Sequence, residues 1–225
     1  MSSSRAAVLI GGRILTIDKV VETWNSHLFA ANNNVSFDLF ISVNSRVACE
    51  VVDVDAIISK AKLVLNPNVS IKYIVQDYAH TDERIAFNIM SMYWHNKKAF
   101  EMISSDTAAY DYVIKWRADI VLQSPLILPT PTPLSPNTNT IYIPNGKDWG
   151  GLNDQIAVGS YVAMKEYCAL IDHIDVLWPV RHPERLLKKY LTSVVTPTPM
   201  IERLRFKWAL HADRNATVLY ANKVV

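Results

Sequence analysis

Short apolar runs alternate with stretches of helical spacing over the first 120 residues, and this alternation limits the possible folds more than any other feature. Residues 6–10 form a continuous apolar run that ends at Gly11 and Gly12, as a buried strand does before a tight turn. We expect further strands at 37–43, 47–52, 70–75 and 110–122, and helices at 16–31, 55–65 and 81–104. This order predicts an α/β sheet, mostly parallel, with helices on both faces.

The remaining third of the chain is expected to complete the same domain. A strand is predicted at 140–144, a helix at 154–170 with Asn153 as its cap, a helix that opens at His182-Pro183, and closing strands at 203–211 and 217–220. A domain linker at 125–136 is the alternative, but the strand at 140–144 and the helix at 154–170 that follow it are too small to form an independent domain. We therefore expect one domain over 1–225, and leave open whether it belongs to a longer polypeptide.

Composition excludes several classes of protein. Half of the residues are hydrophobic and a fifth are charged, which is typical of a globular protein. The net charge is only +2, so the protein has no strong positive field that would attract nucleic acid. The two cysteines stand far apart, so neither a disulfide scaffold nor a zinc site is expected. No secretory signal and no apolar run of about 20 residues is visible. We expect a reducing, cytoplasmic compartment, with at most peripheral membrane contact.

Groups suited to a nucleotide follow several predicted strands, where open α/β sheets bind their ligands. Gly11 and Gly12 allow close approach of a ligand to the backbone, and Arg13 can reach a phosphate. A plain tight turn is the alternative. Asn44 follows the second strand. Arg84 and Asn88 lie one turn apart on a predicted helix, where they contact either a nucleotide or solvent.

Four aspartates, at three places in the sequence, are candidates for chemistry. Asp119 lies in the predicted 110–122 strand, two residues from Arg117 and on the same face. A carboxylate buried there needs a partner, so Asp119 either takes part in metal or phosphate binding or forms an ion pair with Arg117. Asp53-Val54-Asp55 is a literal Asp-x-Asp, but helix capping explains it. Asp154, in the first turn of its predicted helix, is either a general base or a complement to the helix dipole.

Two lone histidines, His182 and His211, are more simply polar side chains than late metal ligands.

The order of these motifs resembles a known family. The strand ending in Gly11-Gly12-Arg13, the run Tyr112-Val-Ile-Lys-Trp-Arg-Ala-Asp119 and the segment Gly150-Gly-Leu-Asn-Asp-Gln155 carry the resemblance, which extends to about Leu191. The chain is similar to small GT-A glycosyltransferases, especially the N-terminal glycosyltransferase domain encoded by large algal (chlorella) viruses. The resemblance implies a nucleotide-binding sheet with a small acceptor-side region, and for a viral source it implies the host cytoplasm.

The resemblance also implies roles for residues. Asp119 matches the last aspartate of the Asp-x-Asp signature that holds Mn²⁺ or Mg²⁺ against the donor diphosphate, while Arg117 stands where the first aspartate would be. Asp154 matches the carboxylate that activates the acceptor. The implied donor pocket comprises Gly11, Gly12, Arg13, Asn44, Arg84, Asn88 and Arg117.

The expected reaction moves a sugar from a nucleotide-sugar, with UDP as the first choice of nucleotide, to a glycan hydroxyl, with inversion. Two rival functions stay open. A sugar-phosphate nucleotidyltransferase would carry a longer glycine-rich loop with a lysine than Gly11-Gly12-Arg13 provides. A non-catalytic carbohydrate-binding domain would use some of the six tryptophans and ten tyrosines as a sugar-binding face.

Overall fold

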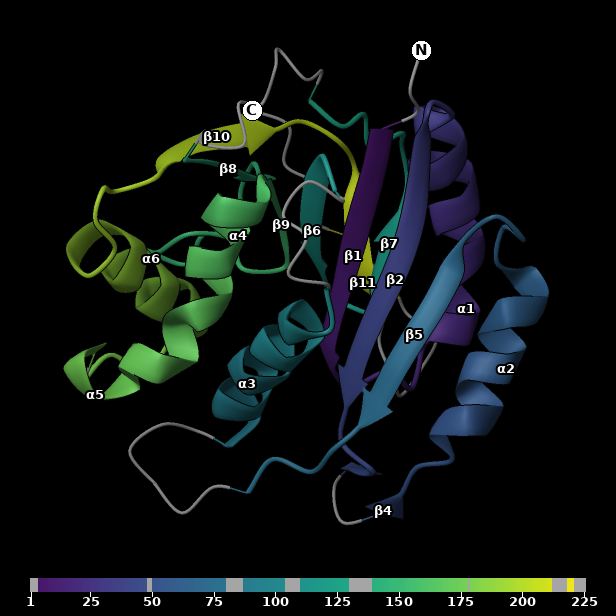
Figure 1. Ribbon diagram of the computed structural model, residues 1–225, viewed down its shortest axis with the longest axis horizontal. Coiled ribbons are helices and arrows are strands. Elements are labelled where there is room, and N and C mark those ends of the chain that lie inside the picture. The colour runs from purple at the N-terminus through teal and green to yellow at the C-terminus, as the bar shows by residue number, and fades with distance from the viewer. Residues whose placement is uncertain are drawn as a thin grey trace.

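A seven-stranded mixed sheet forms the centre of the protein in the computed structural model, which describes residues 4–47, 50–79, 87–103, 110–129, 139–177, 179–211 and 218–220 (Figure 1). In spatial order the strands are β10 (Met200–Leu204), β8 (Thr140–Pro144), β9 (Ile156–Gly159), β6 (Tyr112–Trp116), β1 (Ser4–Gly12), β2 (Val35–Val43) and β5 (Ser70–Val75). Every pairing is parallel except those of β9, which runs antiparallel to both β6 and β8. The predicted α/β class is confirmed.

Helices cover both faces of this sheet, as the continuous apolar strands require. Alternate residues of β1 enter two separate cores, with Val8 in one and Leu9 in the other. The first core is closed by α1 (Ile17–Trp24) and α2 (Val54–Val64), and the second by α3 (Phe87–Glu101), α4 (Tyr161–Cys168) and α6 (Pro183–Ser193). Figure 1 shows α1 and α2 to the right of the sheet, and α3, α4, α6 and the short α5 (Ile174–Leu177) to its left.

Several short elements complete the described chain. A three-stranded antiparallel sheet contains β7 (Ile120–Leu122), β11 (Trp208–His211) and β12 (Val218–Tyr220), and a small hairpin contains β3 (Arg46–Val47) and β4 (Glu50–Val51). Short helical turns occupy Asn25–Phe29, Ala30–Asn32 and Ala169–His173. None of the described helices has the length and apolar character needed to cross a bilayer.

Three predicted strands are wrong in their extent. The predicted closing strand 203–211 is divided between β10 and β11, which belong to different sheets. The run 110–122 is not one strand, because the chain turns after Trp116, where the Ile120 N–H donates to the Arg117 carbonyl at 3.3 Å, and β7 then joins the smaller sheet. Arg117 and Asp119 therefore lie in a turn rather than in a strand. The predicted third strand, 47–52, is part of the hairpin and adds nothing to the central sheet.

The predicted helix at 154–170 is also wrong at its start. Asn153 does not cap a helix: its side-chain oxygen accepts from the Gln155 N–H at 2.9 Å, and β9 follows directly. The helix begins only at Tyr161, after Ser160 has accepted from the Ala163 N–H at 3.2 Å. Asp154 is therefore a buried residue before a strand and not an acid in a first helical turn.

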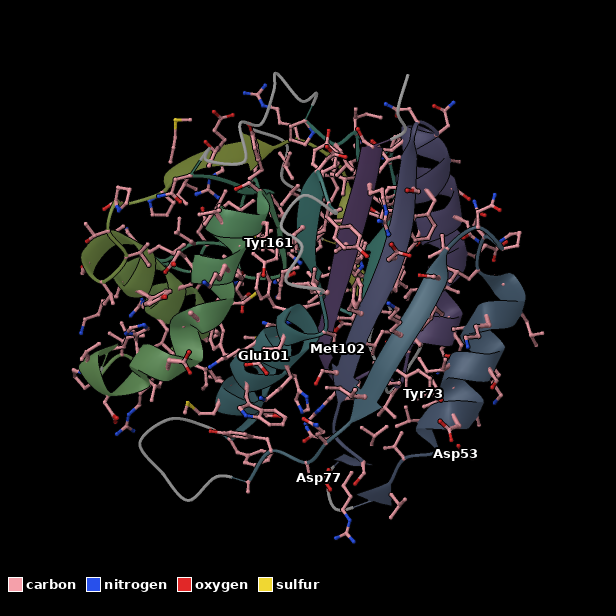
Figure 2. The ribbon with its side chains drawn as sticks, in the orientation of Figure 1. Asp53, Tyr73, Asp77, Glu101, Met102 and Tyr161 are labelled. Atoms are coloured by element: carbon pink, nitrogen blue, oxygen red, sulfur yellow. The ribbon has the colours of Figure 1, made fainter. Side chains whose placement is uncertain are left out.

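Other local predictions hold. The Asp53 carboxylate caps α2 by accepting from the Ala56 N–H at 2.9 Å, so the literal Asp-x-Asp is a helix start, and Asp55 accepts from the Tyr73 hydroxyl at 2.6 Å (Figure 2). Pro183 is the first residue of α6. The first turn of the 81–104 helix, with Arg84, lies outside the described residues.

Gly11 lies where α3 packs directly on β1. A Cβ atom there would stand 2.7 Å from the Asn96 backbone nitrogen and 2.9 Å from the His95 carbonyl carbon, and both atoms belong to α3. Gly11 is thus the end of a strand with no room for a side chain, and not part of a free turn.

Replacing Gly11 with alanine is expected to destabilise the protein by roughly 3 kcal/mol, because backbone must move to admit the methyl group. Thermal unfolding should show this as a fall in Tm of about 6–10 °C. Gly146→Ala is the matched control: Gly146 has φ +86° but no atom near its Cβ position, so only the backbone cost of about 1 kcal/mol applies. Equal falls in Tm for both variants would contradict the close packing of α3 on Gly11.

Candidate active site

The carboxyl ends of five strands meet at one edge of the sheet. β1, β2, β5, β6 and β8 run parallel to one another in the sheet, and the arrowheads of β1, β2 and β5 point to the lower edge in Figure 1. Strand order reverses at β1, since β2 and β5 follow on one side of it and β6 stands on the other. Such a reversal opens a crevice at the carboxyl edge, where α/β proteins bind their ligands.

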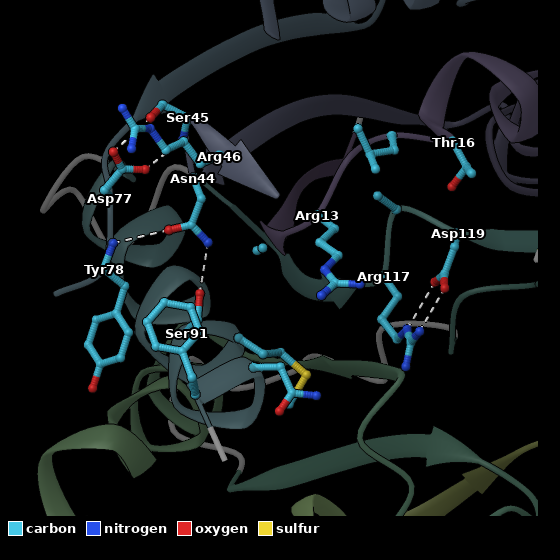
Figure 3. Close-up of a pocket in the computed structure, with 17 residues that line it drawn as sticks. Arg13, Thr16, Asn44, Ser45, Arg46, Asp77, Tyr78, Ser91, Arg117 and Asp119 are labelled. Carbon is cyan, nitrogen blue, oxygen red and sulfur yellow. Dashed lines mark hydrogen bonds and ion pairs between the residues drawn. The ribbon is translucent and has the colours of Figure 1, made fainter. Parts of the chain in front are cut away.

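A pocket of about 820 Å³ occupies this place (Figure 3). Its walls come from the ends of four strands and from the start of α3, and include Gly11, Gly12, Arg13, Asn44, Ser45, Arg46, Asp77, Tyr78, Phe87, Asn88, Ser91, Met92, Arg117, Ala118 and Asp119. Six of the seven predicted donor-binding residues line the pocket, as does Asp119. The seventh, Arg84, falls outside the described part of the chain, and Asp154 is not among the described lining residues.

Arg117 and Asp119 form a two-point ion pair at one end of the pocket. Arg117 Nε lies 2.9 Å from Asp119 Oδ1, and Nη2 lies 2.6 Å from Oδ2 (Figure 3). Burial lowers the pKa of Arg117, but the hydrogen bonds that it donates to Asp119 and the charges of Asp119, Asp154 and Glu184 outweigh this and raise the pKa above its ordinary value. Arg117 is therefore a permanent cation, and about a third of its side chain is exposed.

The surroundings of Asp119 decide whether Mn²⁺ or Mg²⁺ fits there. Both carboxylate oxygens already accept from Arg117, and the described residues hold no cluster of three or more His, Cys, Asp or Glu side chains suited to a metal ion. The backbone N–H of His211 donates to the Asp119 carbonyl at 2.8 Å. Divalent cations need free carboxylate oxygens. The arrangement does not fit a protein-held metal unless Arg117 moves away.

Asn44, in the pocket wall, connects three segments of the chain by hydrogen bonds. Its side-chain amide donates to Ser91 Oγ on α3 at 2.9 Å, and its oxygen accepts from the Tyr78 N–H at 3.0 Å (Figure 3). Beside it, Asp77 accepts from the Ser45 N–H at 2.8 Å and from Ser45 Oγ at 2.7 Å, and these bonds lower the pKa of the Asp77 carboxyl. Figure 2 places Asp77 beyond the tip of β5. Asn44 thus shapes the pocket wall through its bonds within the protein.

The opposite end of the pocket is aromatic. The rings of Tyr78 and Phe87 lie 5.7 Å apart between centroids, and Trp94 packs behind Tyr78 at 5.5 Å. Phe87 is 51 % exposed. Arg13 lies between this end and Arg117 in Figure 3, and within the described ranges it makes no ion pair. Sequence reasoning missed Tyr78, although it stands three residues after the predicted 70–75 strand.

Asp154 lies beside the Arg117 end of the pocket. β9 pairs with β6 from Trp116↔Ile156 onward, so the residues just before β9 meet the turn that follows β6. The charge of Asp154 contributes to the raised pKa of Arg117, which agrees with this placement. Asp154 is only 3 % exposed, and the Lys115 ammonium group donates to its backbone carbonyl.

The loop between β8 and Asp154 is strained and firmly anchored. Lys147 and Trp149 have φ values of 56° and 46°, which are uncommon for residues other than glycine. Asp148 Oδ1 accepts from Arg203 on β10 at 2.8 Å and from the Asn153 N–H at 3.0 Å. Gly151 packs so closely on the Glu184 carbonyl of α6 that a Cβ would overlap it. Trp149 is nevertheless 61 % exposed.

Such strain is typical of functional sites.

Comparison with known proteins gives a fold but no family. No family model matches the chain, and no curated protein matches its sequence. Among solved structures, the apo structure of the bifunctional glycosyltransferase WbbM is similar over 91 % of this chain, with 13 % identity and a TM-score of 0.51. This chain spans only 39 % of the WbbM chain. The likeness supports a GT-A-like fold, and nothing in it bears on the resemblance to algal viruses.

Proposed function

We propose that this protein transfers a sugar from a nucleoside-diphosphate sugar, with UDP as the expected nucleotide, to a hydroxyl group of a glycan. The observation that carries the proposal is the pocket at the carboxyl edge, which joins an aromatic end to two arginines across about 820 Å³. This volume is within the range of pockets that hold small organic ligands. The glycosyltransferase fold of the structural neighbour agrees with the proposal.

The pocket suggests how the donor would lie. The nucleobase would pack at the Tyr78–Phe87 end, because flat rings stack on aromatic side chains. The diphosphate would then lie against the backbone after β1 and beside Arg13, with the sugar toward Arg117. Arginine is well suited to phosphate, since its planar fork donates two parallel bonds.

In this proposal the reaction is a single displacement at the anomeric carbon. The acceptor oxygen forms the new bond, its proton passes to the Asp154 carboxylate, and the nucleoside diphosphate leaves with the electron pair of the old bond. Arg13 and Arg117 stabilise the negative charge that develops on the diphosphate. One displacement inverts the anomeric configuration. Asp119 holds no metal ion in this step, because Arg117 occupies both of its carboxylate oxygens.

Calorimetric titration with UDP and GDP, each with and without Mn²⁺, tests the donor site. We expect one nucleotide to bind with micromolar affinity and the affinity to change less than threefold with Mn²⁺, because arginines supply the positive charge. A large gain with Mn²⁺ would mean that Arg117 releases Asp119 to a metal when the diphosphate binds. No binding of either nucleotide would contradict the proposed function and favour a non-catalytic sugar-binding domain.

A further inference from the structure

Lys115 is a charged residue at the centre of the sheet. It lies on β6, between Leu9 of β1 and Ala157 of β9, and its exposed fraction is 1 %. Lysine is almost never buried without a partner, because removing an ammonium group from water is costly. Its neighbours on β6 are apolar and buried, so packing alone would favour another valine or isoleucine here. The lysine therefore calls for a specific explanation.

The ammonium group of Lys115 donates to the backbone carbonyl of Asp154. It thereby joins the strand that carries Arg117 to the residue proposed as the base. The bond is between a charged donor and a neutral acceptor inside the core, where such bonds are stronger than in water. On the other side of Asp154, the Leu152 N–H donates to the Glu184 carbonyl at 3.0 Å. The backbone of residue 154 is thus hydrogen-bonded to β6, and Leu152, two residues earlier, is hydrogen-bonded to α6.

Several ionisable groups surround Lys115 and Asp154. Burial lowers the pKa of Lys115 to about 8, while the negative charges of Asp154 and Asp119 oppose this and Arg117 adds to it. From α4, Cys168 also faces Lys115, and burial raises the pKa of that thiol to about 12. Tyr93 of α3, Tyr167 of α4 and Glu184 of α6 face Asp154, and burial and the Asp154 charge raise the pKa of each. At neutral pH, Lys115 is the cation closest to the Asp154 backbone.

We propose that Lys115 is the positioning residue for Asp154: its ammonium group fixes the backbone of residue 154 and keeps a positive charge behind the carboxylate that receives the proton. This role rests on the proposed function. It explains why a lysine lies in the core beside the pocket and takes no part in lining it. Lys115 is not a catalytic residue, because it acts only through Asp154.

The test compares Lys115→Met with Lys165→Met, the same substitution at an exposed lysine of α4. UDP and GDP serve as binding probes, and UDP-glucose, UDP-galactose and GDP-mannose serve as turnover probes. For Lys115→Met we expect kcat to fall about 100-fold with the nucleotide Kd within twofold of wild type. In the Asp154→Asn background the same change should cost less than threefold, because residues that act as a unit are not additive. Lys165→Met should behave as wild type.

Two further readouts separate positioning from plain structural support. Wild-type kcat should fall as pH rises above about 8, where Lys115 loses its proton, and Lys115→Met should lack this fall. Amide hydrogen exchange in residues 152–157 should be faster in Lys115→Met even without substrate. Unchanged kcat and unchanged exchange in a folded variant would overturn the proposal. If the variant does not fold, a wild-type kcat that stays constant from pH 7 to 10 would overturn it.

Failure of the proposed function has a different signature. Wild-type protein that binds neither nucleotide and turns over none of the three sugar nucleotides would disprove the function, and with it the role of Lys115. Wild-type turnover that Lys115→Met retains in full would disprove the role of Lys115 alone.

Discussion

Replacing Asp154 with asparagine is expected to reduce sugar transfer by roughly 1,000-fold or more, because an amide cannot receive the proton of the acceptor hydroxyl. Nucleotide affinity should stay within twofold of wild type, since Asp154 does not line the donor pocket. The side chains have the same shape, so the core around residue 154 should remain packed. Turnover is measured as the nucleoside diphosphate released from the sugar nucleotide, and nucleotide affinity is measured by calorimetric titration with UDP or GDP.

Asp172→Asn is the control for this variant. Asp172 is exposed and pairs with Lys97 at 2.7 Å, outside the pocket, so turnover should not change. Near-normal turnover of Asp154→Asn would show that another group, or water, receives the proton. The anomeric configuration of the product gives an independent check, because retention would exclude a single back-side displacement and would require a different role for this carboxylate.

Replacing Arg117 with methionine is expected to lower kcat by about 100- to 1,000-fold, because the leaving diphosphate loses one of its two proposed cations. Nucleotide affinity should fall by about tenfold for the same reason. The Asp119 carboxylate then loses the partner of both its oxygens and adds negative charge to the site. Arg205→Met, at an exposed arginine beyond β10, is the matched control and should leave both quantities unchanged.

A second change at the same position tests the metal directly. Arg117→Asp creates an Asp-x-Asp sequence with Asp119 and frees both oxygens of Asp119. We expect nucleotide binding by this variant to be weak alone and to recover at least partly with Mn²⁺, while wild type shows little response. Calorimetric titration of wild type and Arg117→Asp with the nucleotide, with and without Mn²⁺, measures this difference. A wild-type response to Mn²⁺ as large as that of the variant would contradict the view that Arg117 takes the place of a cation.

The central sheet was predictable because its strands are continuous apolar runs. Residues 6–10 and 37–43 proved to be strands, and their burial on both faces leaves a clear apolar pattern. Residues 70–75 also proved to be a strand, although this edge strand has no fully buried residue. The short strand β9 was missed because Ile156–Gly159 offers only four residues, too few to distinguish from the first turn of a helix. The break after Trp116 was hidden for a related reason, because apolar residues continue into β7 while the chain changes sheets.

The candidate site was predictable where residues follow strands directly. Gly11, Arg13, Asn44 and Arg117 meet at the pocket because parallel strands end at one edge. Hydrogen bonds between residues that are far apart in the sequence could not be predicted in the same way. Nothing local shows that Lys115 reaches the carbonyl of Asp154, or that both oxygens of Asp119 are taken by Arg117. A lysine inside Val113-Ile114-Lys115-Trp116 was nevertheless a visible signal of a buried charge.

The reversed direction of β9 makes the proposed proton transfer to Asp154 depend on the register of two strands, β6 and β9. Trp116↔Ile156 is the last pair of the ladder, and the chain then brings Ala118 and Asp154 to the same edge from opposite directions. Asp154 stands between Asn153 and Gln155, two amides that cannot act as bases. A shift of β9 by one residue in its register with β6 would place one of these amides, in place of Asp154, beside the acceptor. Accuracy of backbone pairing, rather than closure of two domains, would then separate an active molecule from an inert one.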